Sequence, residues 1–200
     1  GSISMFFTYA TIHHEEVRAV IDMPPTGEKD VQVKGCVEMK DGRISMEGTV
    51  ACGKPMVKSH LATIEMKDAN QADLRILNNL KIGDVQEKIV MVAPGTIDAR
   101  LKNAEDTIDW YQEKSPWGAL VIPLSNLWST MHIYDNQQFK AVPFFGASEF
   151  CMVNGPVKAG VEYRAVNKIV SVGLTSKTEL FWMNGWLYEK DKLIATMRHL

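Results

Sequence analysis

The chain has 200 residues, somewhat more than the roughly 150 of an average domain, so we expect one large domain or two small ones and exclude a long multidomain protein. Hydrophobic residues make up 46% and charged residues 23%, which is typical of a globular protein with a core and excludes a disordered chain. The net charge of −2 argues against a nucleic-acid partner, because such proteins usually carry a basic excess.

Cysteine usage and hydropathy indicate the compartment. The cysteines are Cys36, Cys52 and Cys151, an odd number without CxxC spacing, so neither a disulfide framework nor a zinc site is indicated. The pair His13-His14 has no third ligand at a useful spacing, so we predict no metal and no cofactor. No stretch approaches the ~18 apolar residues of a membrane span, and we expect a cytoplasmic protein without a membrane partner.

The first third of the chain predicts a β-meander. Alternating runs at Val31–Met39 and Ile44–Val50 flank Asp41-Gly42, a strong hairpin signature. A third run, from Pro55 to Met66, is expected to complete three strands. The stretch from Met5 to Val20 is either a strand followed by a short helix or one bent strand.

A polar linker over residues 67–79 separates this unit, residues 1–66, from a second unit, residues 80–200. The second unit begins with a strand at Val85–Val92 and a helix that has Thr96 as its N-cap and Ile97 and Leu101 on one side. Further strands are predicted at 144–153, 162–172, 177–188 and 193–199.

A longer apolar segment predicts the central helix of this unit. Apolar residues recur there with the i, i+3, i+4, i+7 spacing of a buried helical stripe, at Leu124, Leu127, Trp128 and Met131. In the strand over 177–188 both faces are apolar, so that strand should be covered on both sides. An α+β fold with an antiparallel sheet wrapped around a long helix buries this pattern.

Residues 31–66 look like the last three strands of the second unit without its helix. True duplication and chance similarity between two antiparallel meanders both stay open.

Four segments, in this order and spacing, resemble one family. They are Leu80-Lys-Ile-Gly83-Asp84, the stretch from Asp106 to Tyr111, Ser115-Pro-Trp-Gly118, and the stretch from Gly155 to Tyr163. From Leu80 to Leu200 the chain resembles the hot-dog fold and, within it, the MaoC-like hydratases and dehydratases of acyl thioesters. The resemblance implies a complete hot-dog unit in the second region and a partial one, without its helix, in the first.

The activity that this resemblance implies is lyase chemistry, the hydration of a 2-enoyl thioester or the dehydration of a 3-hydroxyacyl thioester. Asp106 falls on the family's catalytic Asp, whereas Tyr111 stands where the family has a His. Asp109 is a candidate for the second acid or base. Simple packing is the alternative role for Tyr111, and a surface charge is the alternative for Asp109.

The resemblance further implies that amides near the start of the central helix hold the thioester oxygen. The expected substrate-binding residues are Trp117, Gly118, Leu124, Ser125, Asn126, Trp128 and His132. Of these, Ser125 and Asn126 have the alternative role of satisfying the first N–H groups of the helix, and His132 that of an ordinary helical histidine.

The expected partner is an acyl-CoA or acyl-carrier-protein thioester of fatty-acid or polyketide-like metabolism, and the expected assembly is a homodimer. Because the family His is missing, three alternatives stay open. The first is a thioesterase, isomerase or cyclase acting on a polyketide-like substrate. The second is a non-catalytic hot-dog subunit that binds lipid or a partner, and the third is a different β-barrel around an apolar ligand.

Overall fold

The computed structural model describes the chain except residues 13, 25–26, 55–56, 102–107 and 135–138 and the side chains of 98–100. The strands are β1 (Ser2–Phe7), β2 (Val17–Ile21), β3 (Val31–Met39), β4 (Ile44–Cys52), β5 (Val85–Met91), β6 (Ala147–Met152), β7 (Glu162–Leu174), β8 (Glu179–Glu189) and β9 (Lys192–His199). The helices are α1 (His60–Thr63), α2 (Pro94–Leu101) and α3 (Leu124–Met131), with 3₁₀ turns η1 (Gln71–Asp73) and η2 (Asp109–Tyr111).

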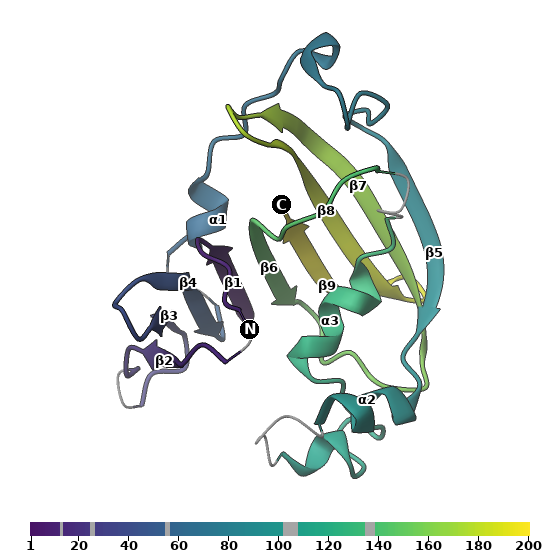
Figure 1. Ribbon diagram of the computed structural model, residues 1–200. Coiled ribbons are helices and arrows are strands. Elements are labelled where there is room, and N and C mark those ends of the chain that lie inside the picture. The colour runs from purple at the N-terminus through teal and green to yellow at the C-terminus, as the bar shows by residue number, and fades with distance from the viewer. Residues whose placement is uncertain (13, 25–26, 55–56, 102–107, 135–138) are drawn as a thin grey trace.

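All nine strands form one antiparallel sheet in the order β2-β3-β4-β1-β6-β9-β8-β7-β5 (Figure 1). The pairing of β1 with β6 joins an N-terminal half of four strands to a C-terminal half of five. Within the N-terminal half, Gly48 of β4 lies against β1, where an added Cβ would collide with the Ser4 carbonyl. Only glycine therefore allows the two backbones to approach so closely.

The hairpin predicted at Asp41-Gly42 is confirmed, since β3 and β4 pair across it. The third strand predicted between Pro55 and Met66 is wrong. Residues His60–Thr63 form helix α1 instead, with the Ser59 hydroxyl accepting a hydrogen bond from the Ala62 N–H. Leu61 is fully buried in this helix, so the helix covers one face of the sheet and does not add a strand to it.

For the stretch from Met5 to Val20 the sequence left two alternatives, a strand followed by a helix or one bent strand. The structure has two separate strands instead, β1 and β2. The order of the sheet places them apart, because β1 pairs with β4 and β6 whereas β2 pairs only with β3. In the described part of this stretch there is no helix.

In the C-terminal half the strands and the central helix are confirmed. The helix predicted to start after Thr96 begins at Pro94 instead, because proline fits the first helical turn. Helix α3 spans eight residues and is shorter than predicted, with Leu127 and Met131 fully buried against the sheet.

A buried amide from the sheet fixes the end of α3. The Asn167 side chain of β7 donates from Nδ2 to the Met131 carbonyl at 2.8 Å and accepts at Oδ1 from the Ile133 N–H at 2.9 Å. Gly185 lies opposite Asn167 on the neighbouring strand β8. Because it has no side chain, it leaves space for the Asn167 amide, since a Cβ there would lie 3.0 Å from Asn167 Nδ2. The helix is therefore held by polar contacts as well as by apolar packing.

Strand β8 is covered on both faces, as predicted. Met183 and Leu187 belong to the main core beneath α3, whereas Trp182 packs with Leu61 of α1 on the opposite face. In both clusters these side chains are buried, at most 3% exposed.

Residues 67–79, predicted as a polar linker, pack against the C-terminal half. Leu74 and Leu77 are buried in the main core. The Glu179 carboxylate of β8 accepts hydrogen bonds from three consecutive amides, those of Arg75, Ile76 and Leu77. Burial raises the pKa of Glu179, but these donors outweigh it and lower the pKa. The division into units at 66 and 80 stays a prediction.

Candidate functional site

A cleft of about 970 Å³ separates α3 from the strands of the N-terminal half. Its walls come from α3, from β1, β3, β4 and β6, and from the segments 8–11 and 144–145. The lining residues are Met5, Phe7, Thr8, Tyr9, Ala10, Thr11, Val37, Ser45, Met46, Leu124, Ser125, Trp128, Ser129, Phe144, Phe145, Ser148 and Phe150. None of them is charged, which favours a neutral, largely apolar ligand.

Three of the predicted substrate-binding residues, Leu124, Ser125 and Trp128, lie together in this cleft. They occupy the first two turns of α3, and Trp128 also packs against the main core. Leu124 is half-exposed in the cleft, whereas Leu127 on the opposite side of the helix is fully buried.

The start of α3 offers free hydrogen-bond donors. Its N-cap is Pro123, which provides no side-chain acceptor. Among the described residues nothing accepts a hydrogen bond from the amides of Leu124 and Ser125, whereas the Asn126 N–H bonds to the Pro123 carbonyl. Unbonded amides at a helix N-terminus favour a negatively charged oxygen.

Asn126 faces the core rather than the cleft. Its side chain is buried, and its Oδ1 has no hydrogen-bond partner within the described ranges. Its assignment as a substrate-binding residue stays a prediction.

The 3₁₀ turn η2 is hydrogen-bonded to the segment that leads into α3. Asp109 and Tyr111 are the ends of the 3₁₀ turn η2, and the Val121 N–H donates to the Trp110 carbonyl at 2.9 Å. Tyr111 is half-buried and packs against the main core, while Asp109 is exposed. Asp106 lies outside the described residues.

Trp117 and Gly118 form a turn away from the cleft lining. The Trp117 ring is half-exposed and meets the Trp110 ring edge-on at 5.2 Å. Gly118 has a φ of +81°, and its N–H donates to the Ser115 carbonyl, as a tight turn requires. Their predicted contact with substrate therefore remains untested.

Two histidines stand behind the cleft wall, and the sequence interpretation missed one of them. His132, just after α3, stacks on Trp128 with ring centroids 4.4 Å apart. His199 of β9 lies 5.8 Å from the His132 ring, and its Nδ1 is 2.7 Å from the Ser148 hydroxyl of β6. Ser148 and His199 are opposite each other in the ladder, so strand register could have revealed the pair.

Burial and the neighbouring His132 lower the pKa of His199 to about 4, against an opposing backbone hydrogen bond to Ala147. Burial likewise lowers the pKa of His132. Both imidazoles are therefore neutral at pH 7, and this wall of the cleft carries no charge.

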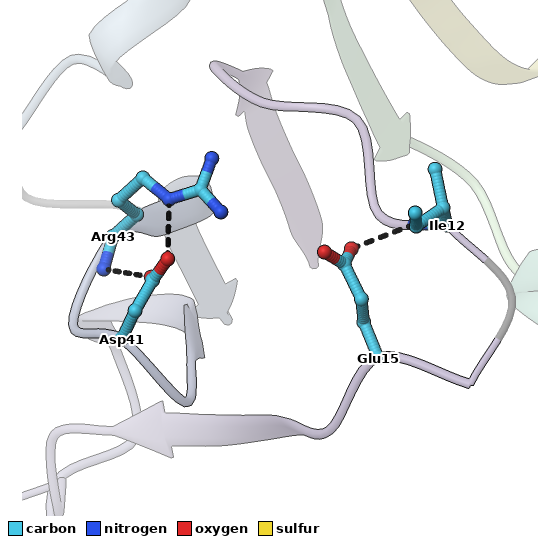
Figure 2. A network of polar contacts seen from close by, with 4 residues as sticks. All are labelled: Ile12, Glu15, Asp41 and Arg43. Carbon is cyan, nitrogen blue, oxygen red and sulfur yellow. Dashed lines mark hydrogen bonds and ion pairs between the residues drawn. The ribbon is translucent and has the colours of Figure 1, made fainter.

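The opposite wall of the cleft includes the segment 8–11, and polar contacts hold this segment against β4. The Ser45 hydroxyl donates to the Tyr9 carbonyl at 3.0 Å, and Arg43 lies over the Tyr9 ring at 5.4 Å. Figure 2 shows Arg43 paired with Asp41 at 2.7 Å and the Glu15 carboxylate accepting from the Ile12 N–H at 2.8 Å. These charged groups lie outside the cleft lining, so they position the segment without adding charge to the cleft.

Metal-ligating side chains do not converge in the part of the chain that the structure describes, where no group of three or more His, Cys, Asp or Glu could hold an ion. None of the described helices combines the length and the apolar character needed to cross a membrane.

Comparisons of the fold give clear matches, although no family model and no curated protein sequence matches the chain. A solved MaoC-like dehydratase is 11% identical over 99% of this chain and 74% of its own, with a TM-score of 0.64. A Mycobacterium tuberculosis protein with a double hotdog fold is 10% identical over 100% and 74%, with a TM-score of 0.62. A proposed oleoyl thioesterase from Lactobacillus plantarum is 11% identical over 99% and 73%, with a TM-score of 0.52.

Because the sequence identities are only 10–11%, these matches establish the fold alone. The chain has the hot-dog fold, as the resemblance of its second region predicted, and its structure is similar to those of MaoC-like dehydratases. The α+β class with an antiparallel sheet around a central helix is confirmed.

Proposed function

We propose that the chain binds an acyl thioester with the acyl group in the cleft beside α3 and catalyses its hydration or dehydration. The observation that carries the proposal is the uncharged lining of the cleft next to the amides of Leu124 and Ser125, which donate to no acceptor among the described residues. A volume of about 970 Å³ is at the upper end of the usual range for ligand pockets, which suits a long acyl group.

The start of α3 suits the thioester carbonyl. Removal of the α-proton of a 3-hydroxyacyl thioester places negative charge on this oxygen, and loss of the 3-hydroxyl as water completes the 2-enoyl product. Amide donors at a helix N-terminus stabilise the developing charge. The Leu124 and Ser125 amides are the donors we assign to this role.

The acid and base are assigned to Asp106 and to the residues of η2. Asp106 would handle the α-proton and the leaving water, with Tyr111 or Asp109 as its partner. The contact between Val121 and Trp110 supports this assignment, since it holds η2 next to the start of α3. A phenol is a weaker base than an imidazole at neutral pH, so Tyr111 suits hydrogen-bond donation better than proton abstraction.

The direct test is hydration of crotonyl-CoA, followed by the loss of enoyl absorbance. Asp106→Asn should lower kcat/KM by about 100-fold or more, and Tyr111→Phe by about 10-fold, as expected for a general acid–base pair. Asp191→Asn, in the turn between β8 and β9, is the matched control and should leave the rate unchanged. Wild-type rates in both loop variants would contradict the assignment.

The replacement of the family imidazole by Tyr111 favours a second candidate, a non-catalytic acyl-binding subunit. Lipid that co-purifies with the protein, identified by mass spectrometry, without turnover of crotonyl-CoA would support it. The third candidate is a thioesterase, isomerase or cyclase; release of free CoA measured with a thiol reagent identifies the thioesterase. The choice between acyl-CoA and acyl-carrier-protein, a polyketide-like substrate and the cytoplasmic location stay predictions.

A further inference from the structure

The cleft contains a buried polar pair that the proposed reaction does not use. Ser148 of β6 lines the cleft, and its Oγ lies 2.7 Å from Nδ1 of His199 on β9. The two residues are direct partners between neighbouring antiparallel strands, so their side chains lie side by side on one face of the sheet. Only 2% of Ser148 and 7% of His199 is exposed. Polar groups buried this deeply cost free energy unless they are hydrogen-bonded.

Other hydroxyls of the cleft lining are bonded to the backbone of the chain itself. Ser129 donates to the Asn126 carbonyl of its own helix at 3.0 Å, and Ser45 donates to the Tyr9 carbonyl at 3.0 Å. Ser148 instead faces an imidazole nitrogen, which donates or accepts according to the tautomer of the ring. Its hydroxyl is therefore not committed to one direction of hydrogen bonding.

This pair can bond one more oxygen. A serine hydroxyl has one donor and two acceptor sites, and among the described residues the Ser148 hydroxyl has His199 as its one hydrogen-bond partner. When Ser148 donates to His199, its lone pairs can accept from a ligand hydroxyl; when His199 donates to Ser148, the serine can donate to a ligand carbonyl. Burial and the neighbouring His132 lower the pKa of His199 to about 4, so the ring is neutral at pH 7. The pair therefore suits an uncharged oxygen.

Two ring nitrogens beside the pair also lack a partner. The rings of Trp128 and His132 stack on each other, and their centroids lie 5.9 and 5.8 Å from that of His199. Nε1 of Trp128 and Nε2 of His132 are buried and make no hydrogen bond within the described ranges. Buried polar atoms are rarely left unpaired in native proteins, so these nitrogens are further candidates to bond a polar group of a ligand.

The position of the pair along α3 relates it to the acyl chain. The thioester oxygen is assigned to the amides of Leu124 and Ser125, at the start of the helix. Trp128 and His132, which contact the pair, follow Leu124 by four and eight residues, or about 6 and 12 Å along the helix axis. An extended hydrocarbon chain advances about 1.3 Å per carbon–carbon bond, so the pair lies beside about carbons 6 to 10 of the acyl group.

We propose that the Ser148–His199 pair binds an oxygen on the distal part of the acyl chain, so that the substrate is an acyl thioester with a hydroxyl or keto group near carbon 8, a position that is about the middle of this range. The inference rests on the proposed function, because the carbons are counted from the thioester oxygen at the start of α3. Ser148 and His199 are binding residues in this proposal and lie away from the reacting carbons.

The test compares three thioesters by isothermal titration calorimetry: dodecanoyl-, 8-hydroxydodecanoyl- and 8-oxododecanoyl-pantetheine. Pantetheine is the part that CoA and acyl carrier proteins share, and without a 3-hydroxyl none of the three can be dehydrated. The hydroxy or the oxo thioester should bind about five- to tenfold more tightly than the plain one, since one added hydrogen bond contributes about this factor. The tighter of the two identifies the oxygen that the pair recognises.

The outcomes separate this inference from the proposed function. Binding of all three thioesters with equal affinity would overturn the inference and leave the proposed function standing. No binding of any of them would contradict both.

Variants assign the preference to the pair. Ser148→Ala should reduce the affinity for the oxygenated thioester to that for the plain one. His199→Phe, which keeps an aromatic ring beside Trp128 but removes the ring nitrogens, should also weaken the preference. Ser129→Ala is the matched control and should retain the preference, because its hydroxyl lines the same cleft but bonds to its own helix. An undiminished preference in whichever of Ser148→Ala and His199→Phe folds, as judged by circular dichroism, would overturn the proposal.

Discussion

The two halves of the sheet share a strand order but not a core. In the C-terminal half, α3 and β5 cover one face and one edge, and the central residues of that face have no exposed surface. In the N-terminal half the same face carries Val37 and Met46, both half-buried along the cleft. This difference shows that the burial of a sheet face depends on the helix packed against it and not on the strands alone.

Matched methionine truncations should separate the halves most strongly. Met131→Ala removes a fully buried side chain of α3 and should lower the free energy of unfolding by about 2–5 kcal/mol. Met46→Ala, on the uncovered half of the same face, should cost about 1 kcal/mol or less. Urea unfolding followed by circular dichroism measures both. Equal losses would show that Met46 is buried in solution.

Acid should lower the free energy of unfolding through His199 in the C-terminal half. The pKa of His199 is about 4 in the folded chain and 6.5 ordinarily, so between these values the unfolded state binds more protons. Stability is therefore retained above pH 6.5 and falls as the pH drops toward 4, by up to about 3 kcal/mol. Unfolding measured across this window should flatten in His199→Gln. An unchanged pH profile in that variant would exclude His199 as the cause.

The polar anchor of α3 gives a smaller effect. Asn167→Ala removes both hydrogen bonds that hold the end of the helix and leaves buried backbone groups unpaired, which should cost about 2–3 kcal/mol. Asn184→Ala, with one bond to Arg198 on the opposite face, is the matched control and should cost under about 1 kcal/mol. If the two variants unfold at the same urea concentration, the anchor contributes nothing specific.

The smallest effect is expected at the segment before β5. Glu179→Gln keeps one acceptor of the carboxylate but weakens its three amide contacts, and should cost about 1 kcal/mol. Exchange of the Arg75, Ile76 and Leu77 amides should speed up while that of α3 does not. Faster exchange in both regions would mean that the segment and the core unfold together.

Local patterns predicted the elements wherever periodicity and burial agree. The Asp41-Gly42 hairpin and the position of α3 were correct, because turn chemistry and a 3.6-residue period act over short distances. Of the predicted buried stripe, Leu127 and Met131 are buried, whereas Leu124 is exposed in the cleft. The segment from Pro55 to Met66 was misread, since a single buried residue, Leu61, gives a one-turn helix no periodic signal.

The candidate site was only partly predictable. Leu124, Ser125 and Trp128 were identified from the start of one helix. Most of the remaining lining comes from four distant strands and the segments 8–11 and 144–145, and no local pattern indicates that Met46 of β4 and Ser148 of β6 line the same cavity. Likewise, His199 is unremarkable in sequence, and its neutral state follows from burial and from His132 nearby.

The sequence by itself determined the Asp41-Gly42 hairpin, the C-terminal strands and the place of the central helix, because these depend on turn residues and periodicity, and the resemblance of residues 80–200 to a known family indicated the hot-dog fold. Only the tertiary structure decided that β1 joins β6, that one nine-stranded sheet results among the described residues, and that Val37 and Met46 stay half-buried along the cleft. Those features depend on which edges and faces meet, and such long-range pairings are fixed by packing of the whole chain rather than by any one segment.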